Sequence, residues 1–195
     1  MKNAEEICPR VIIRTQSRGQ KFQGAALFDR DGTLNEDVGY LYRAEDFRWV
    51  QGAIEALCFC HAQGFLTAVL TNQSGIARGY YTEADVLRLH AWMNADLAKH
   101  GTYLDALYFC PHHPEAQDPR YRLDCPARKP APRMVMKALA DFSVPREKAF
   151  LIGDRARDVE AAERAGVRGF LYAGGSLLTT TREAFQALGS FANKI

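Results

Sequence analysis

The chain has 195 residues, of which 47% are apolar and 25% are charged, the composition of an ordinary soluble globular domain. Its 25 Lys and Arg residues against 23 Asp and Glu residues leave a formal net charge of +2 without any block of like charge, so neither a nucleic acid nor an anionic membrane surface is expected as a partner. The longest strongly apolar stretch, 65–70, is far shorter than the about 20 residues that span a bilayer, so we expect no membrane protein.

The N-terminal segment does not have the pattern of an export signal. Glu5, Glu6 and Pro9 stand where a signal peptide carries its apolar core. The chain has an odd number of cysteines, namely Cys8, Cys58, Cys60, Cys110 and Cys125, and it is long enough to fold without disulfides. These features predict reduced thiols and a cytoplasmic protein.

Short apolar runs bounded by turn residues predict strands, and amphipathic segments between and after them predict helices. The predicted strands are 25–28, 65–70, 106–109, 149–152 and 169–172, and the predicted helices are 53–63, 82–99, 132–141, 155–165 and 181–192. Thr82 is expected to cap the second of these helices. Residues 1–22 are expected to form an N-terminal arm or, through 11–14, an extra edge strand, and residues 23–195 a single domain.

The alternation of strands and helices predicts the fold class. Strands that are joined through helices run parallel with right-handed crossovers, so helices cover both faces of the sheet. We therefore predict an α/β fold with a doubly wound, Rossmann-like parallel sheet. Such folds bind ligands at the carboxyl ends of their strands, near the point at which the strand order reverses.

Polar residues that suit phosphate chemistry follow the predicted strands. They are Asp29, Asp31, Thr71, Asn72, Arg128, Lys129 and Asp154. Neighbouring carboxylates repel one another unless a cation is present, and an all-oxygen set suits Mg²⁺. Lys129 adds positive charge for an anionic substrate. Charge neutralisation around a fixed nucleophile is what phosphoryl transfer requires, so the strand ends predict that reaction class.

Four segments in chain order carry a resemblance to a known superfamily. They are Phe28-Asp29-Arg30-Asp31-Gly32-Thr33-Leu34, Leu70-Thr71-Asn72, Arg128-Lys129-Pro130, and Ile152-Gly153-Asp154 with Asp158. Together they resemble the ordered motifs of the haloacid dehalogenase superfamily of phosphohydrolases over about 25–172. The resemblance implies a domain of that type. The 42-residue separation of Asp29 and Thr71 leaves no room for a cap domain.

Two further segments narrow the resemblance. Thr71-Asn72-Gln73-Ser74-Gly75-Ile76-Ala77-Arg78-Gly79 and Cys110-Pro111-His112-His113-Pro114 resemble the D-glycero-D-manno-heptose 1,7-bisphosphate 7-phosphatases of lipopolysaccharide precursor synthesis. Histidinol-phosphate phosphatases are near relatives that share the Cys-Pro-His loop and the Arg-Lys-Pro motif. Their second motif tends to have Asn-Gln-Asp-Gly, so Ser74 favours the heptose family.

By this resemblance, two aspartates carry out the chemistry. Asp29 is implied as the nucleophile that forms an aspartyl-phosphate. Asp31 is implied as the acid that protonates the leaving sugar oxygen and then as the base that activates water. Thr71, the backbone of Asn72 and the Lys129 side chain are implied to hold the transferring phosphoryl group.

The resemblance also implies a magnesium ion. Its ligands would be the carboxylates of Asp29 and Asp154 and the main-chain carbonyl of Asp31, an oxygen set of the kind that Mg²⁺ prefers. Asp158 follows Asp154 by one helical turn. Two interpretations of Asp158 stay open: it orients a metal ligand, or it is a first-turn charge favoured by the helix dipole.

Without a cap, substrate specificity is expected to come from the loops 30–48, 73–81 and 108–130. In the family, the sugar or its distal phosphate is contacted by residues that match Asp37, Gly39, Tyr40 and Arg128. Further candidate substrate contacts are Asn72, Gln73, Ser74, Arg78 and Arg155. Arg128 is favoured for the distal phosphate, because a planar guanidinium binds phosphate through two parallel hydrogen bonds.

The third loop matches most of a zinc-binding pattern of the family. That pattern has Cys-x-His followed by Cys-x-Cys, four ligands that close around zinc. Cys110, His112 and Cys125 match it, but Ala127 stands at the fourth position. His113 or Asp124 is a possible replacement. Because a thiolate is missing, we expect an incomplete set and weak or absent zinc.

The sequence therefore predicts a magnesium-dependent phosphatase without a cap, acting on a small sugar phosphate and most simply on the C7 phosphate of a heptose 1,7-bisphosphate. Histidinol phosphate is the alternative substrate. A catalytically silent scaffold that binds a partner through 110–130 is the alternative from another class. We expect a monomer that binds neither nucleic acid nor membrane.

Overall fold

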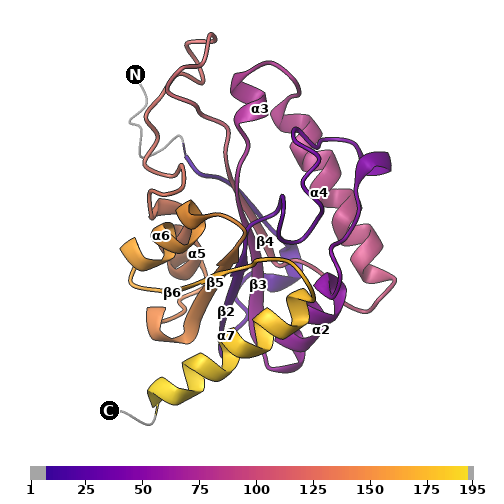
Figure 1. The fold of residues 1–195 in the computed structure, drawn as a ribbon, viewed down its shortest axis with the longest axis vertical. Helices are drawn as coiled ribbons and strands as arrows, with labels where there is room; N and C mark the ends of the chain where they lie inside the picture. Colours follow the sequence, from indigo (N-terminus) through magenta and orange to yellow (C-terminus); the bar gives the residue numbers. More distant parts are fainter. Residues whose placement is uncertain (1–7, 193–195) are drawn as a thin grey trace.

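A computed structural model describes residues 8–192, and a six-stranded sheet lies at its centre (Figure 1). The strands are β1 (Arg10–Ile13), β2 (Gly24–Phe28), β3 (Phe65–Asn72), β4 (Ala106–Cys110), β5 (Ala149–Gly153) and β6 (Arg168–Leu171). Their order across the sheet is β1-β4-β3-β2-β5-β6. All five strands predicted from apolar runs are present, and β2 to β6 pair in parallel as expected.

The helices also follow the predicted pattern. They are α2 (Ala53–Ala62), α3 (Ser74–Ala77), α4 (Glu83–Ala98), α5 (Arg133–Asp141), α6 (Ala156–Arg164) and α7 (Leu177–Ala192), with short 3₁₀ turns at Thr15–Ser17, Ala44–Asp46 and Arg146–Lys148. Thr82 caps α4 in a capping box with Asp85, as predicted. The start of α7 was predicted wrongly at 181. The Thr181 hydroxyl instead donates to the Leu177 carbonyl inside the helix.

The segment before residue 23 contributes an edge strand, the second of the two forms expected for it. Strand β1 pairs antiparallel with β4, from Arg10 opposite Phe109 to Ile13 opposite Ala106. The sheet is therefore mixed rather than purely parallel. The part of this segment at 1–7 lies outside the described residues.

Helices cover both faces of the sheet, and the side chains of β2 alternate between them. Ala26 and Phe28 pack with α2, α4 and α7 on one face. Ala25 and Leu27 pack with α5 and α6 on the other. This alternation follows from the two-residue period of a strand that is buried on both faces.

The strand order reverses at β2. From β2 the chain moves outward through β3 and β4, and it then returns to add β5 and β6 on the other side. The carboxyl end of β2 is therefore the position at which this fold class binds ligands. Between β2 and β3 the chain forms only the 3₁₀ turn Ala44–Asp46 and α2, so this insertion holds no cap domain, as predicted.

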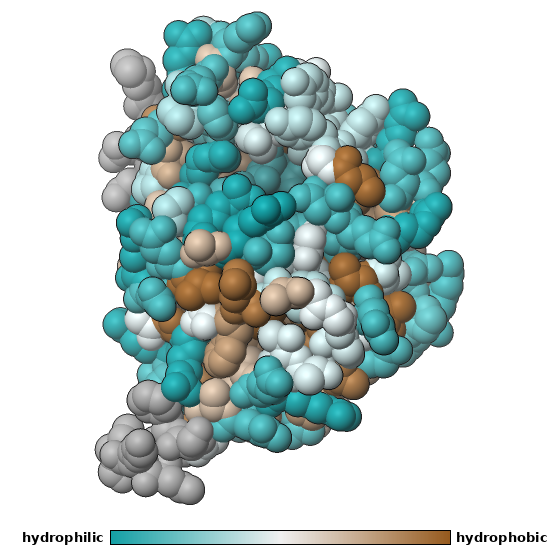
Figure 2. All heavy atoms as spheres, in the orientation of Figure 1, coloured by the Kyte–Doolittle hydropathy of each residue, from teal (hydrophilic) through white to brown (hydrophobic). Residues whose placement is uncertain are grey.

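The described surface is largely polar where α3 and α6 rise beyond the sheet, as the teal residues of Figure 2 show. Hydrophobic residues gather lower on this face, close to β6 and α7 in the view of Figure 1. Within residues 8–192, no helix is both long enough and apolar enough to span a membrane.

One buried histidine makes the free energy of unfolding depend on pH. His90 on α4 is only 7% exposed, and its Nδ1 has no hydrogen-bond partner among the described residues. Burial, with repulsion from the Arg30 guanidinium, lowers the pKa of His90 to about 4. Between about pH 6.5 and 4 the unfolded chain therefore takes up a proton at this ring, and the folded chain does not.

We expect the free energy of unfolding to fall in that pH window because of His90. Its contribution is complete above about pH 6.5 and is lost progressively toward pH 4, by up to about 3 kcal/mol. His90→Gln, which cannot titrate, should flatten that part of the pH profile in urea unfolding. His100→Gln, at an exposed position after α4, is the control. Equal slopes for wild type and His90→Gln would contradict the assignment.

Candidate active site

Asp29 follows β2 directly and lies buried at the carboxyl edge of the sheet. Its backbone N–H donates to the Ile152 carbonyl at 2.9 Å, which continues the pairing of β2 with β5. Lys129 Nζ lies 2.7 Å from Asp29 Oδ1 and 2.6 Å from Asp158 Oδ1, and it donates to the Leu70 carbonyl at 2.6 Å. One buried ammonium therefore joins β2, β3 and α6.

The protonation of this ion pair follows from its burial. Burial raises the pKa of Asp29 to about 6, and the Lys129 ammonium opposes part of that rise. Burial also disfavours the charge of Lys129, but Asp29 and Asp158 outweigh burial and raise its pKa. At neutral pH the pair is a carboxylate beside an ammonium, which is the charge state that a nucleophilic aspartate requires.

Three carboxylates form the only cluster of acidic side chains among residues 8–192 that could hold a metal ion. Oxygens of Asp29, Asp154 and Asp158 lie within 4.8 Å of one another. Asp154 Oδ1 is buried without a hydrogen-bond partner, and burial raises the pKa of this carboxyl. A Cβ at Gly32 would lie 2.5 Å from Asp154 Oδ2, so only glycine at this position avoids a steric clash with the Asp154 carboxylate. The unpartnered oxygen in an all-oxygen set fits Mg²⁺.

Asp158 lies in the first turn of α6, the second of the two interpretations that the sequence left open. Its Oδ2 accepts the backbone N–H of Arg155 at the start of α6, which is the position that the helix dipole favours. Its Oδ1 pairs with Lys129. Asp158 thus caps α6 and also holds the ammonium beside Asp29.

Asp31 points into a ring of hydrogen-bond donors that the sequence did not predict. Arg30, only 2% exposed, donates through Nε and Nη2 to both Asp31 oxygens at 3.0 Å. Arg30 Nη2 also donates to the Leu41 carbonyl. Asn35 Nδ2 and Gln73 Nε2 add donors at 3.2 and 3.0 Å. The Asp31 carboxylate is therefore fixed in orientation next to Asp29.

Two expected substrate residues of the second motif hold the site together. Gln73 is buried and donates through Nε2 to Thr71 Oγ1 at 2.9 Å as well as to Asp31. Asn72 Nδ2 donates to the Lys129 carbonyl, and the Lys129 N–H donates to Asn72 Oδ1, both at 3.0 Å. This reciprocal pair fixes the loop that carries Lys129. Ser74 is the first residue of α3 and is partly buried.

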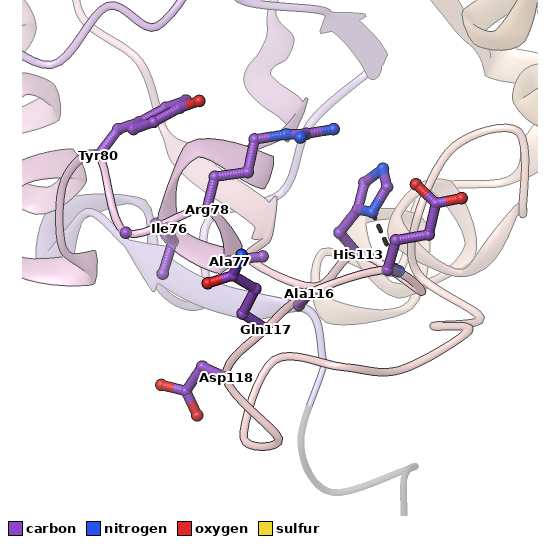
Figure 3. Close-up of a pocket in the computed structure, with 10 residues that line it drawn as sticks. Ile76, Ala77, Arg78, Tyr80, His113, Ala116, Gln117 and Asp118 are labelled. Carbon is purple, nitrogen blue, oxygen red and sulfur yellow. Dashed lines mark hydrogen bonds between the residues drawn. The ribbon is translucent and has the colours of Figure 1, made fainter.

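A pocket of about 580 Å³ opens between α3 and the loop that follows β4, and none of Asp29, Asp31 and Lys129 lines it. Its lining includes Arg78, Tyr80 and His113, and Figure 3 shows the Arg78 guanidinium extending toward the His113 ring. Burial, together with the charges of Arg128 and Arg78, lowers the pKa of His113. The pocket lining thus carries charges of both signs, with Arg78 on one side and the carboxylates of Glu115 and Asp118 on the other.

Arg128 is partly buried and lies among other cations. Its Nη1 donates to the His112 carbonyl at 3.2 Å. Burial lowers the pKa of Arg128, and the charges of Arg157 and Arg78 add to that effect. Arg157 on α6 was not predicted as a site residue, because a single exposed arginine has no distinctive sequence pattern. Arg78 and Arg157 therefore lie close enough to Arg128 for their charges to act on it.

The remaining candidate substrate contacts lie on exposed loops. Arg155 pairs with Asp154 at 2.8 Å and with Asp37 at 3.3 Å. Asp37 Oδ1 accepts the N–H of Gly39, which has a φ of 91°. The Tyr40 ring lies 4.6 Å from that of Tyr80, between ring centres. These contacts connect the loop after β2 to the rim of the pocket.

The cluster of soft side chains has one member more than the sequence predicted. Cys110, His112 and Cys125 come together as predicted, and a fourth residue that could hold a metal lies with them. It is the thiol of Cys8, just before β1, and the four ligand atoms lie within 4.8 Å of one another. Neither His113 nor Asp124 completes the set. Local spacing could not indicate Cys8, because a long stretch of chain separates it from the other ligands.

Known proteins resemble this chain in sequence and in fold. A family model described as HAD-hydrolase-like matches residues 126–191. The D-glycero-beta-D-manno-heptose-1,7-bisphosphate 7-phosphatase of Photorhabdus laumondii is 42% identical over 143 residues, which cover 73% of this chain and 76% of that protein.

Two solved structures share the fold over most of the chain. A HAD-like phosphatase from Mesorhizobium loti superposes with a TM-score of 0.83 at 25% identity and covers 96% of each chain. The D,D-heptose 1,7-bisphosphate phosphatase of B. bronchiseptica, solved with magnesium and phosphate, has a TM-score of 0.69 at 25% identity and covers 88% of this chain and 99% of that chain.

Proposed function

We propose that this chain removes the C7 phosphate of a heptose 1,7-bisphosphate. The chain belongs to the family of D-glycero-D-manno-heptose 1,7-bisphosphate 7-phosphatases and is a phosphatase of the haloacid dehalogenase superfamily. The observation that carries the proposal is the buried ion pair of Asp29 and Lys129 at the carboxyl end of β2, 2.7 Å between Oδ1 and Nζ. It supplies a nucleophile and a cation at one point.

The reaction proceeds in two displacements at phosphorus. An Asp29 carboxylate oxygen attacks the C7 phosphorus, the bond from phosphorus to the sugar oxygen breaks, and Asp31 protonates that oxygen. Asp31 then takes a proton from a water molecule, which attacks the phosphoryl group on Asp29 and releases inorganic phosphate. Both Asp31 oxygens accept hydrogen bonds in the structure, so Asp31 exchanges one of them for the leaving oxygen.

Other groups stabilise the transferring phosphoryl group. The Thr71 hydroxyl, the Asn72 backbone and the Lys129 ammonium lie at the same sheet edge and bind its equatorial oxygens. Magnesium would be held by the Asp29 and Asp154 carboxylates and the Asp31 carbonyl, and it would supply further positive charge for the phosphoryl group. The unpartnered Asp154 Oδ1 supports this ligand assignment.

The distal phosphate of the bisphosphate binds where cationic side chains gather. Arg128 is the principal contact, and Arg78 and Arg157 lie near enough to influence its pKa. A phosphate dianion relieves the repulsion among these guanidiniums, whereas a neutral or cationic group does not. This cluster therefore favours a bisphosphate over histidinol phosphate, which carries a cationic amine in place of a second phosphate.

We expect Arg128→Ala to impair hydrolysis of the bisphosphate far more than hydrolysis of a simple monophosphate. A charge-assisted contact contributes roughly 1.5 to 3 kcal/mol, equivalent to about a ten- to hundredfold loss in kcat/KM. Steady-state kinetics on both substrates provide the measurement. Arg88→Ala on the exposed side of α4 is the matched control. A uniform loss would place Arg128 at the transferring phosphoryl group instead.

Phosphate release from a substrate panel tests the proposed function. The panel contains both anomers of heptose 1,7-bisphosphate, histidinol phosphate and an oligonucleotide 3′-phosphate, each with magnesium and with a chelator. We expect the highest kcat/KM for one heptose anomer and no turnover with chelator. Preference for histidinol phosphate would replace the heptose assignment.

We also propose that the protein is cytoplasmic and that it is a monomer. A cytoplasmic enzyme is supported by the five reduced thiols of the chain, since the cytoplasm keeps thiols reduced. A monomer is proposed because one chain brings together every group used above. Light scattering of the purified protein tests the monomer.

A further inference from the structure

Four buried soft ligands meet at the start of β1. The exposed fractions are 3% for Cys8, 0% for Cys110, 1% for His112 and 2% for Cys125. The three thiols are free rather than paired in a disulfide, and the four ligand atoms lie within 4.8 Å of one another. Three sulfurs and one imidazole nitrogen make up a closed zinc site of the structural kind.

Antiparallel pairing brings Cys8 to this place. Arg10 pairs with Phe109, so the chain just before β1 runs alongside the end of β4, where Cys110 lies. Ala127, the residue at the family's fourth ligand position, is fully buried in the same apolar cluster as Cys8. The Cys8 thiol thus lies in the same cluster as position 127, where this chain has alanine in place of the family's cysteine.

The chemistry of the cluster also suits zinc. Thiolate sulfur and imidazole nitrogen are ligands that zinc binds in proteins, and a bound divalent ion stabilises thiolates while their protons leave to solvent. Cys110 Sγ already lies 3.8 Å from His112 Nδ1.

We propose that Cys8, Cys110, His112 and Cys125 bind one zinc ion, with Cys8 in place of the thiolate that the family pattern has at 127. The ion fastens the N-terminal segment and β1 to the loop that carries His113 and Arg128. This site therefore couples the edge of the sheet to the rim of the substrate pocket, and it is separate from the carboxylate cluster.

The metal content of the full chain tests the proposal. Protein expressed with zinc in the medium should carry about one zinc per chain that mild chelation does not remove. X-ray absorption on this unmodified protein should report three sulfur ligands and one nitrogen ligand. A protein without zinc, or one whose zinc has only two sulfur ligands, would overturn the assignment of Cys8.

Variants separate Cys8 from the rest of the set. Cys8→Ser should weaken zinc binding at least about tenfold in chelator competition and remove one thiolate contribution from the Co²⁺ charge-transfer spectrum. Adding Ala127→Cys to that variant should restore both. Cys58→Ser, on a half-buried thiol of α2, is the matched control. Unchanged zinc affinity in Cys8→Ser would show that three ligands suffice.

A second, independent observation concerns Tyr81. Its hydroxyl is buried and donates to Gln73 Oε1 at 2.6 Å, which directs the Gln73 amide nitrogen to Asp31 and Thr71. A Cβ at Gly75 would collide with the Tyr81 ring, so glycine permits the approach. The amide nitrogen of Gln73 thus meets two acceptors and its oxygen meets a donor, so both ends of the amide have matching partners.

We infer that Tyr81 and Gln73 are positioning residues that hold Asp31 and the Thr71 hydroxyl in their reactive orientation. This inference rests on the proposed acid–base role of Asp31. Without the Tyr81 hydroxyl, the Gln73 amide loses the contact that selects its orientation, and a rotated amide would present its oxygen to the Asp31 carboxylate.

The test compares two leaving groups. Tyr81→Phe should lower kcat for an alkyl phosphate by about tenfold and for an aryl phosphate much less, because an aryl oxide leaves without protonation. Tyr42→Phe, whose ring stacks on Tyr81 at 5.4 Å between centres, is the control. Equal losses on both substrates would reduce Tyr81 to a structural residue. Absence of phosphatase activity in the unmodified protein would instead reject the proposed function.

Discussion

Asp29→Asn is expected to lower turnover by about 10⁴-fold or more while the protein stays folded. An amide cannot attack phosphorus, and it cannot bind magnesium as an anion, so both uses of this side chain are lost. A 10⁴-fold loss corresponds to about 5 kcal/mol of activation free energy. The fold should persist, because Asn has the shape of Asp and Lys129 keeps its partners Asp158 and the Leu70 carbonyl.

Phosphate release with the heptose bisphosphate measures the loss, and thermal unfolding with circular dichroism checks the fold. The control is Asp46→Asn, at an exposed position of the 3₁₀ turn Ala44–Asp46. It should retain turnover. Activity of Asp29→Asn close to that of wild type, in protein free of contaminating phosphatase, would end the phosphoenzyme mechanism.

Lys129→Met is expected to reduce both turnover and stability. The substitution removes the only ammonium beside Asp29 and Asp158 in the described structure, and it leaves two buried carboxylates facing each other. Removing one partner of a buried ion pair costs about 3 to 5 kcal/mol. Urea unfolding in the presence of a chelator measures this cost without a contribution from magnesium.

A second substitution distinguishes repulsion from lost packing. Adding Asp158→Asn to Lys129→Met should recover part of the stability, because one of the two facing charges is then absent. The coupling free energy in this double-mutant cycle should be clearly nonzero, since the groups are in direct contact. Additive effects of the two substitutions would mean that Lys129 contributes through packing alone.

Local patterns were sufficient for most of the fold. Apolar runs located β2 to β6, because strands buried on both faces consist of little else. Thr82, predicted as the N-cap, marks the start of α4. Strand–helix alternation then restricted the topology to one class, since crossovers are right-handed and ligands bind where strands end. This rule predicted that the residues following the strands lie at one site, among them Asp29, Lys129 and Asp154.

Other features depend on residues that are far apart in sequence. The β1 edge strand is four residues long and pairs antiparallel with β4, and only that pairing brings Cys8 to Cys110. Arg30 donates both to Asp31 and to the Leu41 carbonyl, so its position depends on the loop that carries Leu41. The hydrogen bond from Tyr81 to Gln73 likewise depends on the path of the chain through α3, which lies between the two residues.

The sequence alone predicted the five parallel strands and the carboxylates at their ends, because these depend on the two-residue strand period and on residues that directly follow a strand. The nucleophile role of Asp29 is what the resemblance to the superfamily implies. Only the tertiary structure decided the fourth soft ligand, the donors around Asp31 and the meeting of Arg78, Arg128 and Arg157. Each of these brings together segments that no local period relates. Their positions follow from packing of the whole chain, which a window of neighbouring residues does not contain.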